Sequence, residues 1–123
     1  MISIGLCRDI RRAAAFCKDF DKIYGNEFYL YEAADNQGFR GGILFEVKSY
    51  LVEAVGYNGP NDRHLFDGLL RAGLNYAEKH GIEAGCLPET FRQSNHTLFA
   101  ELNYPPETVF NIVNFFGKYK SCR

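Results

Sequence analysis

The sequence predicts a single α/β (α+β) domain over residues 1–123, built on a mixed sheet that is flanked by helices. Its length and its 46% content of apolar residues suffice for one ordinary hydrophobic core. Residues 27–57 show a hydrophobic period of two, which predicts an antiparallel meander of three strands. Residues 50–87 then follow the order strand, helix and short apolar run, which predicts a parallel strand reached through a right-handed crossover.

The first predicted elements are a short strand at residues 2–7 and a helix at residues 10–24. Asp9 stands where an N-cap side chain accepts backbone N–H groups, and Gly25 stands where a helix would end. The apolar residues between them recur at three- and four-residue steps, which indicates one buried helix face: Ile10, Ala13, Ala14, Cys17, Phe20 and Tyr24.

The meander begins at Glu27, where aromatic and apolar side chains start to alternate as they do on a pleated, half-buried surface. Residues 35–38 supply the residue types of a turn, and residues 39–47 form the second strand. The tight link Lys48-Ser49 then leads into a third strand at residues 50–57.

A loop at residues 56–62, rich in Gly, Asn and Pro, precedes the longest predicted helix. Asn61 or Asp62 can cap that helix, and Gly81 ends it. Its apolar residues trace one wide stripe: Leu65, Phe66, Leu69, Leu70, Gly73, Leu74 and Ala77. Residues 82–87 are the parallel strand that follows.

The last third of the chain predicts a helix at residues 90–102, with Asn103 as its left-handed terminus. Pro105 and Pro106 prevent its continuation. Residues 108–113 are a candidate closing strand, and residues 114–123 are expected to form a tail.

Charge and composition argue against several classes of partner. Fourteen Lys and Arg against fifteen Asp and Glu give a net charge of −1, and the short basic groups are typical of solvated faces, so no nucleic-acid partner is expected. No apolar run approaches the ~20 residues of a membrane span, and the start of the chain is unlike a signal peptide, so a cytoplasmic protein is expected. The cysteines are then expected as reduced thiols: Cys7, Cys17, Cys86 and Cys122. No Cys or His cluster has zinc-ligand spacing, so no metal is predicted.

The run Asp67-Gly68-Leu69-Leu70-Arg71-Ala72, together with the order of the predicted elements, resembles the GNAT superfamily of acyl-CoA N-acyltransferases. Residues 82–86, 98–104 and the closing strand are similar to the family's later elements. The resemblance implies a GNAT-like fold, acetyl-CoA or CoA as the cofactor, and transfer of an acyl group to an amine acceptor. Because one predicted helix stands where the family usually has two, the acceptor is not predicted.

The resemblance places the coenzyme pyrophosphate at the turn before the second helix. It implies a cofactor site at Val55, Gly56 and Tyr57, whose backbone would polarise the thioester carbonyl, and at residues 62–65. The latter are Asp62, Arg63, His64 and Leu65. The family cradles the pyrophosphate with glycines and free backbone N–H groups of a helix N-terminus.

This chain departs from the family at the three defining positions of that loop, which are Asn61, His64 and Phe66. Asp62 as an N-cap would engage the same N–H groups and repel a diphosphate, whereas Arg63 could partly offset that repulsion. The loop is equally compatible with a capped helix start that binds nothing.

The catalytic side of the resemblance rests on Glu53, the carboxylate available on the strand that carries the family's general base, with Glu46 in reserve. The alternative is that Glu53 lies on the solvated face of an antiparallel strand and has no catalytic role. The family's acidic tyrosine aligns with Phe99, which cannot donate a proton, and Tyr104 is predicted to be a packed aromatic side chain.

Three hypotheses follow. The first is an acyl-CoA-dependent N-acetyltransferase with Glu53 as base. The second is a catalytically inactive GNAT-fold binding or oligomerisation module, because Asn61, His64, Phe66 and Phe99 break the family pattern together. Eleven Phe and eight Tyr leave room for an aromatic surface that forms a homo-dimer. The third is an unrelated α+β domain.

Overall fold

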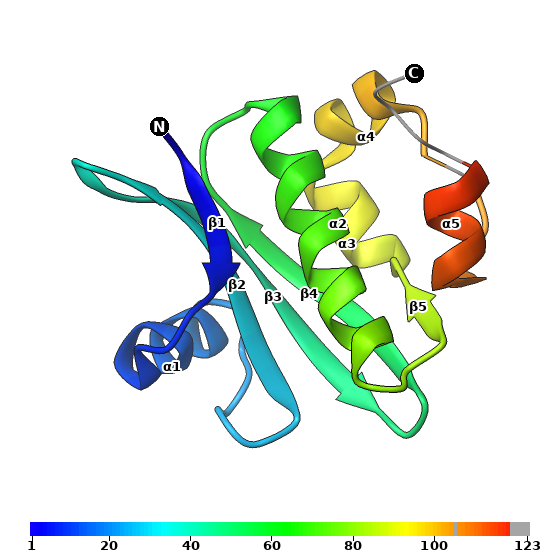
Figure 1. Ribbon diagram of the computed structural model, residues 1–123, viewed down its shortest axis with the longest axis horizontal. Helices are drawn as coiled ribbons and strands as arrows, with labels where there is room; N and C mark the ends of the chain where they lie inside the picture. Colours follow the sequence, from blue (N-terminus) through cyan, green and yellow to red (C-terminus); the bar gives the residue numbers. More distant parts are fainter. Residues whose placement is uncertain (105, 119–123) are drawn as a thin grey trace.

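The computed structural model describes residues 1–104 and 106–118 and contains a six-stranded sheet whose strands lie in chain order (Figure 1). The strands are β1 (Ser3–Leu6), β2 (Phe28–Asp35), β3 (Gly38–Lys48), β4 (Leu51–Asn58), β5 (Ala84–Cys86) and β6 (Val109–Asn111). Neighbouring strands are antiparallel except β4 and β5, which are parallel. The predicted mixed sheet, antiparallel first and then parallel, is confirmed.

Within the described residues, five helices cover the sheet unequally: α1 (Ile10–Asp19), α2 (Arg63–Lys79), α3 (Glu89–Ser94), α4 (His96–Leu102) and α5 (Ile112–Lys118). Figure 1 shows α1 lying apart from the other helices, which gather around α2. The buried side chains accordingly form two separate clusters, one between the sheet and α2 and one between the sheet and α1. We call these two sides the α2 face and the α1 face.

The α2 face holds the larger core, because the apolar stripe of α2 meets the inward side chains of β3 and β4. Alternation along β4 places Val52 and Ala54 on this face and leaves Glu53 on the other. Tyr29 anchors the middle of α2, since its hydroxyl donates to the Gly73 carbonyl oxygen over 2.7 Å.

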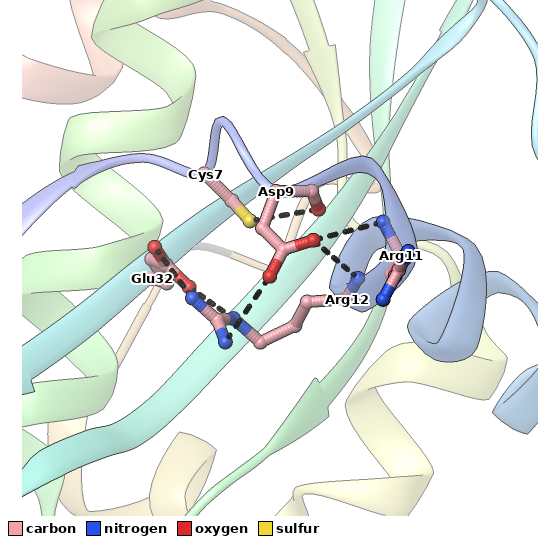
Figure 2. Close-up of polar contacts among 5 residues, drawn as sticks. All are labelled: Cys7, Asp9, Arg11, Arg12 and Glu32. Atoms are coloured by element: carbon pink, nitrogen blue, oxygen red, sulfur yellow. Dashed lines mark hydrogen bonds and ion pairs between the residues drawn. The ribbon is translucent and has the colours of Figure 1, made fainter.

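The α1 face holds a small cluster that includes Phe16 and Cys17 of α1 and Leu44 of β3. An ion pair ties α1 to the sheet as well, because Arg12 Nε donates to Glu32 Oε1 of β2 over 2.7 Å (Figure 2). Asp9 caps α1 as predicted, and its carboxylate accepts from the backbone N–H groups of Arg11 and Arg12 (Figure 2).

Three predicted boundaries are wrong. Helix α1 ends at Asp19 rather than near Gly25, because the chain turns at Phe20 and Asp21 has a left-handed φ of 60°. The helix predicted at residues 90–102 is two helices with a break at Asn95. The closing strand is only three residues long, and α5 occupies residues 112–118, where the end of the strand and the start of a tail were predicted.

Other predicted features are confirmed. Asn103 adopts the left-handed conformation at the end of α4, with φ of 57°. Cys7, Cys17 and Cys86 are free cysteines, whereas Pro105, Cys122 and the rest of the predicted tail from residue 119 lie outside the described residues.

Candidate functional site

The parallel strands β4 and β5 stay together for only three residues. Leu51, Val52 and Glu53 pair with Ala84, Gly85 and Cys86, respectively. Strand β4 continues to Asn58, whereas β5 ends at Cys86 and the chain turns into α3. Residues 54–58 of β4 therefore extend past their parallel partner, and the two strands part immediately after Glu53 and Cys86.

A bulge in β4 lies just beyond that point. Ala54 pairs with Phe45 and Gly56 pairs with Leu44, so Val55 is an additional residue that no residue of β3 pairs with. Val55 packs against the cluster of the α1 face, and a Cβ atom at Gly56 would lie 2.3 Å from the ring of Phe20. Beyond the bulge, Tyr57 returns to the α2 face.

A cavity of about 310 Å³ lies at the far end of β4. One wall is the end of β4 with its following loop, and the other is the junction between α3 and α4. The lining residues are Tyr57, Asn58, Gly59, Pro60, Asn61, Ser94, Asn95, His96, Thr97 and Leu98. We call this space the loop cavity.

Tyr57 is the one predicted cofactor residue that lines the loop cavity. Its hydroxyl donates to the Pro60 carbonyl oxygen over 2.6 Å. Burial raises the pKa of Tyr57 to about 12, and the nearby Asp62 carboxylate contributes to that rise. The phenol therefore remains a neutral hydrogen-bond donor at neutral pH.

The helix that starts beside this cavity is capped by Asp62, as the sequence predicts. Asp62 Oδ1 accepts from the backbone N–H of His64 at 3.0 Å and from that of Leu65 at 3.2 Å. Asp62, Arg63 and His64 are exposed, whereas the Leu65 side chain is buried in the core of the α2 face. None of these four residues lines the loop cavity.

An aromatic cluster fills the interior behind the cavity. Phe66 is fully buried, its ring centroid 4.9 Å from that of Tyr57 and 5.8 Å from those of Phe91 and Phe99. These four rings connect β4, α2, α3 and α4, so Phe66 points into the region between the parted strands rather than into solvent.

The predicted base lies on the opposite face of the sheet. Glu53 is directly across from Glu46 of β3, and the alternation of both strands directs these side chains to the α1 face. Lys48 Nζ lies 3.2 Å from Glu53 Oε1, and Lys22 Nζ lies 3.6 Å from Glu46 Oε1. The structure thus brings the two predicted carboxylates together at the point where β4 leaves β5, but neither carboxylate lines the loop cavity.

The thiol of Cys86, which pairs with Glu53 across β4 and β5, is a poor nucleophile. Cys86 is the register partner of Glu53 and is 7% exposed. Burial raises the pKa of the Cys86 thiol, and the negative charge of Glu53 raises it further. Because the thiolate is the reactive form, Cys86 stays protonated and unreactive at neutral pH.

Comparison with known proteins identifies this architecture. No family model and no curated protein sequence matches the chain. Among solved structures, the ribosomal-protein-S18-alanine N-acetyltransferase from Escherichia coli matches with a TM-score of 0.63 at 16% identity, over 88% of this chain and 80% of that chain. A Desulfovibrio desulfuricans protein assigned to the GNAT family of acetyltransferases gives 0.61 at 7% identity, over 91% and 99%. The chain has the GNAT fold.

A third GNAT-like neighbour was solved with a ligand. The PaiA N-acetyltransferase from Thermoplasma acidophilum, in complex with coenzyme A, matches with a TM-score of 0.53 at 12% identity, over 89% of this chain and 96% of that chain. The alternative of an α+β domain with a fold different from that of GNAT proteins is therefore wrong.

A polar network that the sequence did not reveal joins α2 to the end of α4. Asp67, which is 9% exposed on α2, accepts from Arg71 Nε at 3.0 Å and from the Tyr104 hydroxyl. Burial raises the pKa of Tyr104, and the Asp67 carboxylate raises it further. Tyr104 is packed against Phe99, as predicted, but it also holds α2 to the end of α4. The four-residue spacing of Asp67 and Arg71 was visible in the sequence, whereas their partner lies 37 residues from Asp67.

The two halves of coenzyme A, a pantetheine arm and a nucleotide diphosphate, fit this region unequally. The parted edge of β4 and the polar walls of the loop cavity suit the amide-rich pantetheine arm, which can pair with an extended backbone. The N-terminus of α2 does not suit the diphosphate, because Asp62 occupies the N–H groups of His64 and Leu65.

Side-chain clusters that could bind a metal, and helices that could cross a membrane, were both sought among the described residues. Within residues 1–104 and 106–118, no three or more His, Cys, Asp and Glu side chains are grouped so that they could hold a metal ion. No helix in the same ranges is both long enough and apolar enough to span a bilayer.

Proposed function

We propose that the protein is an acyl-CoA-dependent N-acyltransferase that moves an acetyl group to an amine. The observation that carries the proposal is the separation of β4 from β5 directly after Glu53 and Cys86. Such a separation opens a path through the sheet, so a donor on the α2 face and an acceptor on the α1 face can meet there.

The donor side of the proposal is the edge of β4 at residues 54–58. The pantetheine arm would enter from the loop cavity and pair with this edge as an added strand would. When bound, the coenzyme supplies an activated thioester. A backbone N–H among Val55, Gly56 and Tyr57 would polarise the thioester carbonyl, which is the role of an oxyanion hole.

The acceptor side is the α1 face near Glu53, where a single short helix leaves the sheet partly open. The Glu53 side chain is 21% exposed, and its partner Lys48 is 47% exposed. Glu53 would remove the proton from the attacking amine. Because the Cys86 thiol is protonated, the amine would attack the thioester directly, without an acyl-cysteine intermediate.

The departing thiolate would take its proton from water. Phe99 has no proton to give, and the Tyr104 hydroxyl donates to Asp67. In this mechanism Glu53 is therefore the base, and water rather than a side chain is the acid.

Release of free thiol from acetyl-CoA with a panel of amines tests the proposal. Glu53→Gln should lower kcat by about 10²- to 10⁴-fold because it removes the general base, while leaving thioester binding intact. Glu83→Gln, at an exposed glutamate in the loop before β5, is the matched control and should behave as the wild type. Full activity of Glu53→Gln would exclude Glu53 as the base. Absence of both transfer and thioester binding at millimolar ligand would exclude the function.

The second candidate is a GNAT-fold binding or oligomerisation module without transfer chemistry. The buried ring of Phe66 favours it, because this side chain fills the region between the parted strands where a donor arm would lie. A module of this kind would form a concentration-dependent homo-dimer in light scattering. Acyl transfer that is lost on changing residues 61–66 would exclude it.

A further inference from the structure

The start of α2 offers little to a diphosphate, although it is the helix N-terminus beside the loop cavity. In the first turn of a helix the backbone N–H groups have no partners within the helix, and this is what makes such a terminus an anion site. Here the Asp62 carboxylate accepts from two of them, those of His64 and Leu65, at 3.0 Å and 3.2 Å. A phosphate oxygen would have to displace that carboxylate.

In the described residues, no ion pair involves Asp62, whereas the equivalent cap of α1, Asp9, has Arg12 Nη1 at 3.8 Å. The negative charge of Asp62 reaches the cavity wall, because it contributes to the raised pKa of Tyr57. None of the residues that line the loop cavity is Lys or Arg. The site is therefore electrostatically unfavourable to a dianion.

We propose that the donor site recognises the pantetheine arm of a thioester and discriminates against the nucleotide diphosphate, with Asp62 as the discriminating residue. The inference rests on the proposed function and concerns the chemical class of donor. S-acetylpantetheine, which has the arm and the thioester but no phosphate, should serve as well as acetyl-CoA. A pantetheine thioester attached to a different carrier falls in the same class.

The test measures kcat/KM for acetyl-CoA and for S-acetylpantetheine with one amine, for the wild type, Asp62→Asn and Asp9→Asn. Asparagine preserves an N-cap while removing its charge, so both variants should fold, which thermal melting verifies. The wild type should use the two donors within about threefold of each other. Asp62→Asn should lower KM for acetyl-CoA about tenfold at low salt, less at high salt, and leave S-acetylpantetheine unchanged. Asp9→Asn should change neither.

The outcomes separate the inference from the proposed function. Transfer from acetyl-CoA at least a hundredfold more efficient than from S-acetylpantetheine would overturn the inference and support the function. If no amine is acetylated, the inference is tested by calorimetry, which compares the affinities of the protein for coenzyme A and for pantetheine. Similar affinities in the wild type, with tighter coenzyme A binding by Asp62→Asn, would support the inference and contradict the function. Binding of neither compound would overturn both.

Discussion

The two faces of the sheet are built in contrasting ways. Among the residues that the structure describes, four helices and a core of sixteen buried residues cover the α2 face, whereas one ten-residue helix and a cluster of six buried residues cover the α1 face. The glutamates at the parting of β4 and β5 lie on the thinly covered side, and the loop cavity lies on the thickly covered side. The contrast indicates that stability resides mainly on the α2 face.

The largest effect is expected from the aromatic cluster of the α2 face. Phe66→Ala should lower the free energy of unfolding by about 3–5 kcal/mol, because it removes a fully buried ring and leaves a cavity between three helices and β4. On the α1 face, Phe39→Ala should cost about 1 kcal/mol or less, since that ring is 40% exposed. Urea denaturation measures both, and equal losses would contradict the assignment of stability to the α2 face.

A smaller effect is expected where α2 approaches β3. A Cβ atom at Gly73 would lie 2.1 Å from the fully buried ring of Phe45, so Gly73→Ala should cost about 1–3 kcal/mol through overpacking. Gly68→Ala is the matched control in the same helix, because its Cβ would meet only the flexible tip of Ile4, at 3.0 Å. Gly68→Ala should be neutral or stabilise by up to about 1 kcal/mol. Thermal melting that ranks the two variants in reverse would show that α2 does not pack this closely.

The smallest effect is expected from the ion pair that holds α1. A double-mutant cycle with Arg12→Met and Glu32→Gln should give a coupling of about 0.2–1 kcal/mol, because the Arg12 side chain is 39% exposed. The coupling should fall in 1 M salt, where charges near the surface are screened. A coupling of several kcal/mol, independent of salt, would show that the α1 face is held more firmly than its thin cover indicates.

The order of elements could be predicted from the sequence because it depends on local periodicity. The meander, the long helix and the parallel strand were all visible in that way. The end of α1 was not, because Phe20 and Tyr24 continue the apolar spacing while the chain already turns at Asp21. The break at Asn95 and helix α5 depend on packing against α2, which local patterns do not report.

The candidate site was predictable only in part. The Asp62 cap is a local feature and was recognised, and the position of Glu53 on β4 followed from the strand assignment. The facing of Glu46 and Glu53 depends on strand register, and the bond from Tyr104 to Asp67 spans 37 residues. Tertiary structure sets a contact such as the latter, so a single sequence carries no sign of it.

The bulge at Val55 shifts the alternation of side chains along β4 by one residue. Before the bulge, Val52 and Ala54 face the core beneath α2. After the bulge, Gly56 faces Phe20 on the α1 face, and Tyr57 packs against Phe66 on the α2 face. Without the bulge, the same residues in a regular strand would place Gly56 on the α2 face and Tyr57 on the α1 face. The wall of the loop cavity consequently depends on the bulge as much as on the composition of β4.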